Sequence, residues 1–473
     1  MSGQRSLRLS LYVALCALTE CGAQGLPAER VRQLQEDLAR FNPAAARRAV
    51  ADLSNGPGYD AARHRAAVDA LASQTNGVRL ALEGGDEAKL KEAEARLEAA
   101  RAALLANPLL DFDRLLAVRR TLSPQVARRG LGKEMGFLNL NPFNHADVRR
   151  SGWTNEVVRI SNLRGAPRIE TVCRPAGDTI LRDLDLDFDA RRFLFSGINA
   201  GGRWALFESV EDGSGIREVT PAAYADVDWF DGCYTPDGRI VMLGTAAYQG
   251  LPCVRGSLPV AMLYLLDPKT GAIRQLTFEQ DSDYTPAVLN DGRIVYTRWE
   301  YSDLPHYWSR ILMTMNPDGT TQLSLYGSNS YFPTVLHQCR AVPGDAHQLV
   351  GIVGGHHDVP EIGRLVLLDP MLSRAYPFVY DPPDKSWGAE GTTPFRILPK
   401  TLPKERTGLV HEFPGYGQDV PGDVADGLVR NQFERGKPYF VYPYPLSDKY
   451  VLVSAKTGRE ALDRKSTRLN SSH

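Results

Sequence analysis

The chain lacks an excess of charge of either sign. Its 55 Lys and Arg residues face 56 Asp and Glu residues, and the formal net charge is −1. Nucleic acids and anionic membrane surfaces are bound through a basic excess, so we expect neither partner. The apolar run at residues 9–18 is about ten residues long, which is too short to span a bilayer.

Several catalytic and cofactor motifs are also missing. The sequence contains no Cys-x-x-Cys and no Cys-x-x-Cys-His, and therefore no attachment site for c-type haem. It contains no Gly-x-Ser-x-Gly, no Walker loop and no nucleotide-binding glycine fingerprint. We therefore expect this segment to hold no cofactor of its own and to carry no self-contained catalytic site.

The N-terminus is typical of an export signal. Arg5 and Arg8 precede the apolar run, and small residues follow at 22–25. This pattern predicts a signal peptide over residues 1–25 and a periplasmic or secreted protein. Cys21 raises a lipoprotein alternative, to which Glu20 fits poorly, and a buried N-terminal helix is the structural alternative.

Four cysteines remain after such a cleavage. In an oxidising compartment a disulfide is plausible, and Cys233 and Cys253 are the nearest pair. They flank a single predicted hairpin, so we expect them to form a bridge or to share a ligand.

What the chain does contain is an internal repeat. Asp-Gly or a similar turn precedes an apolar strand five times, with steps of 48, 54, 54 and 103 residues between the turn aspartates; these are Asp189, Asp237, Asp291, Asp345 and Asp448. Internal repeats of this period indicate stacked supersecondary units. The last step is twice the period, and we interpret it as hiding one degenerate blade.

Each period contains two hairpins and hence four strands, which make one propeller blade. The spacing therefore predicts a mainly β fold, a six- or seven-bladed β-propeller over residues 107–462, with a β-sandwich as the alternative. An early strand at residues 109–120 is expected to complete the last blade and so close the ring.

The segment before the repeats has a helical pattern. Apolar residues alternate at spacings of three and four along residues 86–105, at Leu90, Ala93, Leu97, Ala100 and Leu104. Asn107-Pro108 then ends the helix. We predict an α-helical hairpin within residues 26–106 that serves as a packing or partner surface.

The tail at residues 463–473 has neither a strand nor a helix pattern. We interpret it as an adapter-derived artefact, with an ordinary polar tail as the alternative. On the first interpretation the chain is a fragment whose natural sequence continues beyond about Leu462.

Several phrases together resemble one family, the secreted bacterial proteins related to the α subunit of hydrazine synthase, with a TolB/WD40-like propeller. The phrases lie at residues 107–113, 248–254, 289–301, 316–319, 326–331, 350–357 and 442–450. The resemblance implies that c-type haem domains could follow the propeller. It also implies a zinc site near one haem. Cys339 departs from the family, because residues 339–344 read Cys-Arg-Ala-Val-Pro-Gly where relatives usually read Ala-Arg-Pro-Ile-Pro-Gly.

Three groups of residues are candidates for a ligand or a divalent metal. His356 and His357, with Cys339 upstream, offer imidazole and thiolate ligands, although neighbouring histidines on a strand point to opposite faces. The Asp228 and Asp283 carboxylates offer oxygen ligands, although such residues more often cap turns.

The third group lies at a strand end, where propellers bind ligands, and comprises Arg298, Glu300, Asp303 and His306. Its alternative role is to lock adjacent blades together through ion pairs. Asp228, Asp283 and Asn329 also stand at matching places in successive repeats. We therefore expect them to form a polar collar on one face of the propeller.

Three functions fit these features. The first is a binding or scaffold module that presents loops to a protein or carbohydrate partner. The second is the propeller part of a c-type haem oxidoreductase, and the third is the regulatory propeller of a prolyl-oligopeptidase-like hydrolase. A downstream Cys-x-x-Cys-His motif would favour the second, and a downstream Gly-x-Ser-x-Gly motif the third. We rank the binding module first, because a fold alone does not confer an activity.

Overall fold

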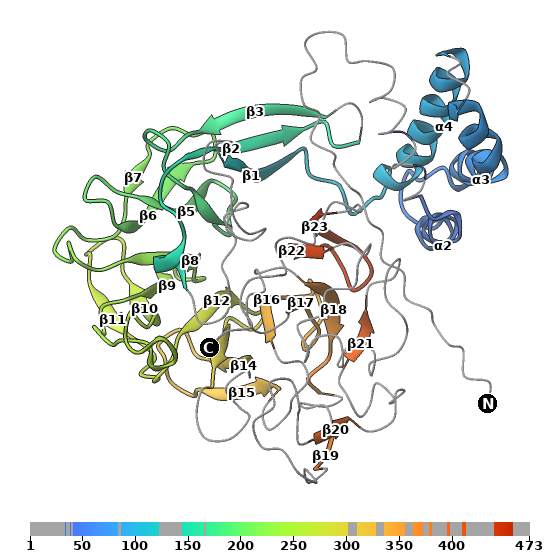
Figure 1. Ribbon diagram of the computed structural model, residues 1–473. Coiled ribbons are helices and arrows are strands. Elements are labelled where there is room, and N and C mark those ends of the chain that lie inside the picture. Colours follow the sequence, from blue (N-terminus) through green and yellow to red (C-terminus); the bar gives the residue numbers. More distant parts are fainter. Residues whose placement is uncertain are drawn as a thin grey trace. The chain divides into compact units, whose positions relative to one another are not determined.

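The computed structural model describes residues 34, 38, 41–83, 87–122, 144–164, 167–300, 310–327, 335–354, 363–371, 378–380, 395–397, 409–412 and 439–456. Figure 1 shows these residues as helices and strands. The expected sites at His356, His357, Asp303, His306 and Asn329 lie outside the described residues.

Three helices lie within the described N-terminal residues: α2 (Pro43–Leu53), α3 (Ala61–Glu83) and α4 (Glu87–Leu105). Helix α2 begins where the Asn42 side chain accepts a hydrogen bond from the backbone of Ala45 at 3.0 Å, with Pro43 in the first turn. The predicted helical hairpin is confirmed, since α3 and α4 pack against each other. Ala93, Leu97 and Ala100 are buried in their contact.

The rest of the described chain is β-structure. The first sheet contains β1 (Arg114–Leu122), β2 (Trp153–Ser161) and β3 (Arg168–Cys173). The second contains β4 (Arg182–Leu186), β5 (Arg192–Ile198), β6 (Trp204–Val210) and β7 (Arg217–Glu218). The third contains β8 (Trp229–Tyr234), β9 (Ile240–Gly244), β10 (Met262–Leu266) and β11 (Ile273–Gln275). Two 3-10 helices, η1 (His145–Asp147) and η2 (Pro252–Val254), lie in the connections.

Three further sheets follow. The fourth contains β12 (Asp283–Val288), β13 (Ile294–Trp299), β14 (Arg310–Met315) and β15 (Leu323–Tyr326). The fifth contains β16 (Val335–Ala341), β17 (Leu349–Gly354), β18 (Arg364–Leu368) and β21 (Leu409–Glu412). A single parallel pair, Arg310 with Val335, joins these two sheets. The sixth contains β22 (Tyr439–Pro445) and β23 (Val451–Lys456), and β19 (Phe378–Tyr380) and β20 (Phe395–Ile397) form a separate hairpin.

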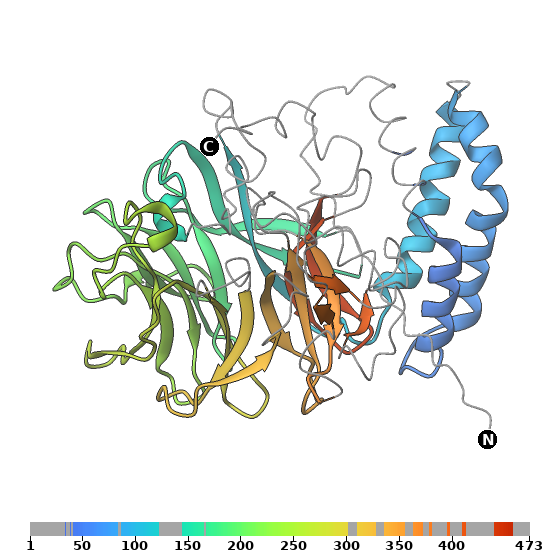
Figure 2. The ribbon, with the colours of Figure 1, turned by 60° about the horizontal axis from the view of Figure 1, so that its bottom comes forward.

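The sheets follow one another around a common centre, as Figures 1 and 2 show. Chain order is the order around the centre, and at the centre the Arg182 side chain of β4 donates to the Tyr442 hydroxyl of β22 at 3.2 Å. The predicted mainly β propeller is confirmed, and the described residues supply six sheets to it.

Two details of the prediction are wrong. The last repeat step does not hide a blade, because β22 contacts β16, β17 and β18 directly. The extra residues of that step include an insertion between β18 and β21 that carries the hairpin of β19 and β20. The early strand does not join the last blade either: β1 pairs with β2, and the Arg119 side chain on β1 donates to Glu156 on β2 at 2.7 Å.

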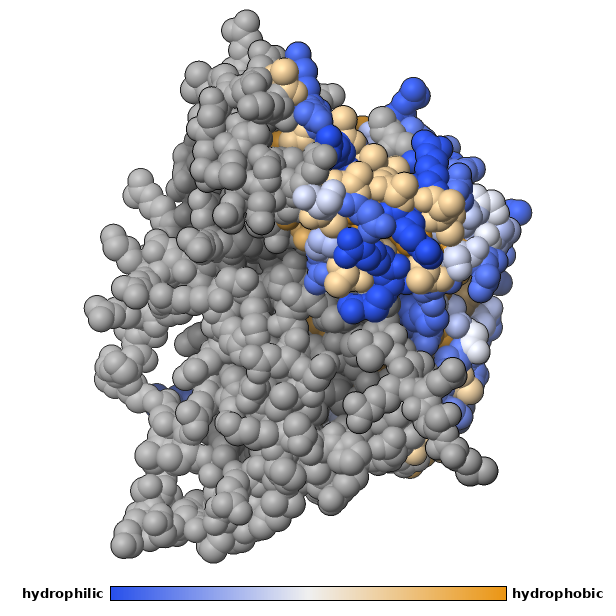
Figure 3. Space-filling model, turned by 90° about the vertical axis from the view of Figure 1, so that its right-hand side faces the viewer, coloured by the Kyte–Doolittle hydropathy of each residue, from blue (hydrophilic) through white to orange (hydrophobic). Residues whose placement is uncertain are grey.

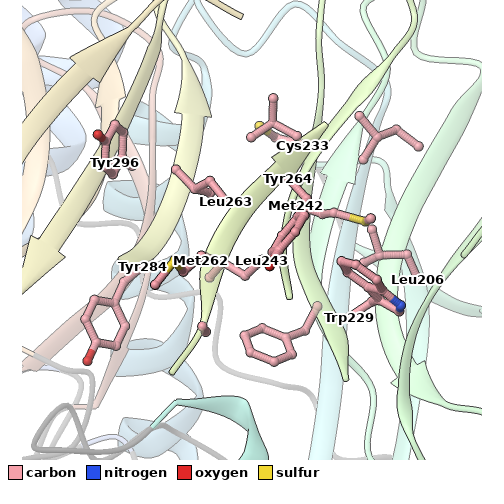
Figure 4. Packing of buried hydrophobic residues seen from close by; sticks show 14 of the residues in the cluster. Leu206, Trp229, Cys233, Met242, Leu243, Met262, Leu263, Tyr264, Tyr284 and Tyr296 are labelled. Atoms are coloured by element: carbon pink, nitrogen blue, oxygen red, sulfur yellow. The ribbon is translucent and has the colours of Figure 1, made fainter. Parts of the chain in front are cut away.

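The largest hydrophobic cluster lies between the blades, and Figure 4 shows its centre. Trp229 meets Tyr264 edge-on at 5.1 Å between ring centroids, and both rings are buried. Opposite Trp229 in the strand register stands Gly244, where a Cβ would lie 2.2 Å from the tryptophan ring. A glycine is therefore required for this ring to fit between two strands.

Among the described helices, none is long and apolar enough to cross a membrane. On the face shown in Figure 3, the described residues carry hydrophilic side chains interspersed with mildly apolar ones.

Candidate functional site: the inner collar and the Asp228 face

The innermost strands share an unusual backbone feature. The pairing of β4, β8, β12 and β16 with the next strand shifts register once in each sheet. At each of these four shifts one residue other than glycine has a positive backbone angle φ: Asp183 (52°), Asp231 (50°), Thr285 (47°) and Gln338 (53°). Tyr442 (55°) is the equivalent residue of β22. Positive φ is uncommon for residues other than glycine, so its recurrence is a property of the repeat.

Hydrogen bonds between blades accompany these bulges. The backbone N–H of Thr285 donates to Asp231 Oδ2 at 3.1 Å, and that of Gln338 donates to Thr285 Oγ1 at 3.0 Å. The N–H of Tyr442 donates to Gln338 Oε1 at 2.6 Å. Each of these side chains thus accepts from the backbone of the next blade. We call the five bulge residues, Asp183, Asp231, Thr285, Gln338 and Tyr442, the collar.

The predicted collar of Asp228, Asp283 and Asn329 differs from this one. In the strand register Trp229 faces Gly244 and Asp283 faces Arg298, which makes Asp283 the equivalent of Trp229 rather than of Asp228. Their assumed equivalence is therefore wrong by one residue, and Ser282 matches Asp228. The repeat did contain the better signal, because Asp183, Asp231, Thr285 and Tyr442 each stand six residues before a turn aspartate.

Asp228 is buried and anchors neighbouring groups. Its Oδ1 accepts from the backbone of Trp204 at 3.0 Å, and its Oδ2 accepts from Arg150 at 3.0 Å and from Arg203 at 3.4 Å. Its own backbone N–H donates to Thr245 Oγ1 at 3.0 Å. The carboxylate therefore ties two blades together and holds two guanidinium groups side by side.

Asp283 is fully buried, and its Oδ2 accepts from Thr277 Oγ1 at 2.5 Å. Burial, with the nearby charge of Glu279, raises the pKa of Asp283 to about 8, although Thr277 and Arg298 oppose the shift. A carboxyl group that is neutral at pH 7 is a poor cation ligand. Among the described residues, no group of three or more His, Cys, Asp or Glu side chains could hold a metal ion.

Of the four residues predicted to form a group at a strand end, the structure describes Arg298 and Glu300. The Arg298 side chain donates to Glu300 at 2.7 Å and to Glu279 at 2.9 Å. Because Glu279 belongs to the connection from the preceding sheet, this arrangement corresponds to the blade-locking alternative. Cys339 lies in the strand β16 and is buried, and burial raises the pKa of its thiol.

The expected bridge between Cys233 and Cys253 is not formed, because Cys233 is a free, buried cysteine. The strand register gives the reason. Cys233 pairs with Val241, whereas Cys253 follows the other end of β9, in η2 beyond Gly244. Three residues of extended strand separate Val241 from Gly244, which corresponds to about 10 Å.

No motif or repeat in the sequence predicts the buried pair of His145 and Asp183. His145 in η1 lies with Nε2 at 2.5 Å from Asp183 Oδ2, and its ring stacks on Phe230 with 4.2 Å between centroids. Burial opposes the charged form of Asp183, but His145 and Arg182 together hold its pKa below the ordinary value. The side chain of Asn144 donates to the backbone oxygen of Pro259 at 2.7 Å. Residues 144–150 therefore attach the first sheet to the next two.

The end of the blades at Asp228 also carries exposed aromatic residues. Ile198 pairs with Trp204, and Trp229 with Gly244, so the connections 199–203, 219–228 and 245–261 meet there. We call this end the Asp228 face. Exposed on it are Tyr224 (39%), Tyr248 (68%) and Phe278 (74%). The Asp-Gly turns, such as Asp237-Gly238, lie at the opposite end.

Radial sheets in chain order define a β-propeller. No family model and no curated protein matches the chain. Among solved structures it is similar to Kuenenia stuttgartiensis hydrazine synthase, with 14% identity, a TM-score of 0.47, and 73% of this chain and 42% of that chain covered. It is also similar to a putative TolB from Agrobacterium tumefaciens, with 16% identity, a TM-score of 0.35, and 55% and 86% covered.

A third similar structure is the β-propeller domain of the Trilobed protease from Pyrococcus furiosus, with 11% identity, a TM-score of 0.29, and 48% and 62% covered. The chain thus spans less than half the length of the hydrazine synthase chain. The assignment of the propeller rests on the order and register of the sheets described above.

Proposed function

We propose that the chain is a periplasmic or secreted binding module, related to the propeller of the hydrazine synthase α subunit, in which a rigid ring of blades presents one face to a protein or carbohydrate partner. The observation that supports this proposal is that polar side chains of the collar form hydrogen bonds between neighbouring blades. Three of the five collar side chains, Asp231, Thr285 and Gln338, accept hydrogen bonds from the next blade.

These bonds hold the inner strands together and leave the loops at the blade ends to vary. Loops on a rigid scaffold are where binding residues concentrate. The Asp228 face fits this role, because large aromatic side chains are exposed there beside arginines and carboxylates. Exposed aromatic groups of this kind commonly mark interaction sites.

The experiment is a ligand screen on the purified protein by thermal shift, with soluble polysaccharides and secreted proteins as probes. Turnover of a chromogenic prolyl peptide and absorbance in the haem Soret band are measured in parallel. We expect binding of at least one probe, no turnover and no haem signal. Peptide turnover or a bound haem would contradict a pure binding function, and so would a failure of every probe to bind.

A further inference from the structure

Two arginines on the Asp228 face share a single carboxylate oxygen. Arg150 and Arg203 both donate to Asp228 Oδ2, at 3.0 and 3.4 Å, while Oδ1 accepts from the backbone of Trp204. The Asp228 side chain is 4% exposed, whereas the two arginine side chains are 30% and 38% exposed. The carboxylate thus fixes two guanidinium groups at the surface.

Within the part of the chain that the structure describes, these two guanidinium groups use only some of their hydrogen-bond donors. A guanidinium carries five N–H donors. Arg203 uses one in its long bond to Asp228, and Arg150 uses one there and one to the backbone oxygen of Gly202. Arg150 and Arg203 together carry one positive charge more than Asp228, and the Asp226 carboxylate beside Tyr248 balances it. Planar guanidinium groups bind carboxylates through paired hydrogen bonds. The remaining N–H donors of Arg150 and Arg203 can therefore bind the carboxylate of a ligand.

An exposed aromatic ring stands beside the pair. The Tyr248 side chain is largely exposed, yet its hydroxyl donates to Asp226 Oδ1 at 2.9 Å and its backbone N–H donates to the oxygen of Thr245 at 3.1 Å. The hydrogen bond to Asp226 raises the pKa of Tyr248, and the positive charge of Arg203 opposes this shift. Tyr224, half-exposed, meets Trp229 edge-on at 5.6 Å. The ring of Tyr248 is therefore held in place with its apolar faces accessible.

Two arginines held by one carboxylate do not by themselves indicate a binding site, because a second such pair occurs in this protein. Glu208 holds Arg192 and Arg217 in a similar way, at 3.0 and 2.6 Å. There both carboxylate oxygens are used, Arg217 donates twice to one of them, and the adjacent Tyr234 is buried. The Asp228 pair differs in its single shared oxygen and its exposed tyrosine. The Glu208 pair therefore provides a matched control.

We propose that this cluster, formed by Arg150, Arg203, Asp226 and Tyr248, binds acidic saccharides built from uronic acids. The sugar carboxylate lies against the two guanidinium groups, the sugar ring lies against Tyr248, and Asp226 accepts from sugar hydroxyls. This inference rests on the proposed binding function and names the class of its ligand.

The test is isothermal titration calorimetry of the whole chain with oligogalacturonate and, as the matched neutral ligand, its methyl ester. We expect binding of the acid and loss of binding on esterification. Arg203→Gln and Arg203→Lys should each weaken binding by about 10- to 100-fold, because a charge-assisted pair of hydrogen bonds is lost. Tyr248→Ala should weaken binding about tenfold. Arg217→Gln should stay within about twofold of the original protein, because added salt and distance screen its charge.

Several results would overturn this ligand class. They are equal binding of the methyl ester, an equal loss in Arg217→Gln, binding of poly-glutamate as tight as that of oligogalacturonate, or no binding of oligogalacturonate. Binding of a neutral polysaccharide that does not depend on Arg203 would overturn the inference and leave the proposed function standing. Thermal unfolding of each variant shows that it is folded, and Arg203→Lys keeps a positive charge beside Asp228 if Arg203→Gln does not fold.

Discussion

Replacing the buried carboxyl group of Asp283 with an amide should stabilise the protein at neutral pH. Asp283 is fully buried on a strand that begins a blade, and its Oδ1 has no hydrogen-bond partner among the described residues. Its pKa is raised from 3.8 to about 8, chiefly by burial. In Asp283→Asn the amide oxygen can still accept from Thr277, and no group remains to ionise.

The magnitude follows from the pKa shift. Between pH 4 and pH 8 the folded chain keeps a proton on Asp283 that the unfolded chain has released, so rising pH favours unfolding. Each pKa unit corresponds to about 1.4 kcal/mol, and the carboxyl group therefore lowers the free energy of unfolding by about 4 kcal/mol at pH 7. An unbonded amide N–H offsets about 1–3 kcal/mol of this. We expect a net gain of about 1–3 kcal/mol.

Urea unfolding at pH 5, 6, 7 and 8 measures the difference between the two proteins. The advantage of Asp283→Asn should grow by about 1.4 kcal/mol per pH unit and level off above pH 8. Asp237→Asn is the matched control, because the hydrogen bond from Arg239 lowers the pKa of Asp237 to about 2. Its effect should be a small loss that does not change between pH 5 and 8. A destabilised Asp283→Asn, or an advantage independent of pH, would refute the reasoning.

Three further predictions concern the fold. Gln338→Leu removes the acceptor of the Tyr442 N–H, so urea unfolding should show a loss of about 1–2 kcal/mol, and an unchanged midpoint would speak against the collar. Gly244→Ala places a Cβ 2.2 Å from the Trp229 ring and should cost about 1–3 kcal/mol, measured as a lower Tm; a Tm at or above that of the original protein would show that the strands can move apart. The buried Cys339, whose thiol pKa is raised, should react with a thiol reagent at pH 8 only after unfolding, and rapid labelling of the folded protein would contradict its burial.

The propeller could be predicted from the sequence because its signal is local. An Asp-Gly turn and the β-branched strand after it, as at Asp291 to Val295, recur in each period and need no knowledge of the partner sheet. The number of sheets could not be obtained in the same way. A step of 103 residues is consistent with two blades or with one blade and an insertion, and only the contacts of β22 with β16, β17 and β18 distinguish them.

The candidate sites were less predictable for a related reason. Spacing placed Asp228 and Asp283 together, but a shift of one residue changes the side of a strand on which a side chain lies. The bulges that separate these positions arise from pairing between strands distant in sequence. His145 was missed because the ion pair with Asp183 spans 38 residues and no repeat marks it.

The collar also bears on how far blades of one chain can drift apart in sequence. Asp231, Thr285 and Gln338 stand at equivalent positions, and the side chain of each accepts a hydrogen bond from a backbone N–H of the next blade. Each side chain needs only one oxygen atom within reach of that N–H. What the ring requires at these places is an acceptor, not a particular amino acid. Exchanging Thr285 and Gln338 should therefore be tolerated, whereas an alkyl side chain at either place should not. A duplicated blade can thus lose its likeness to its parent and still fit into the circle.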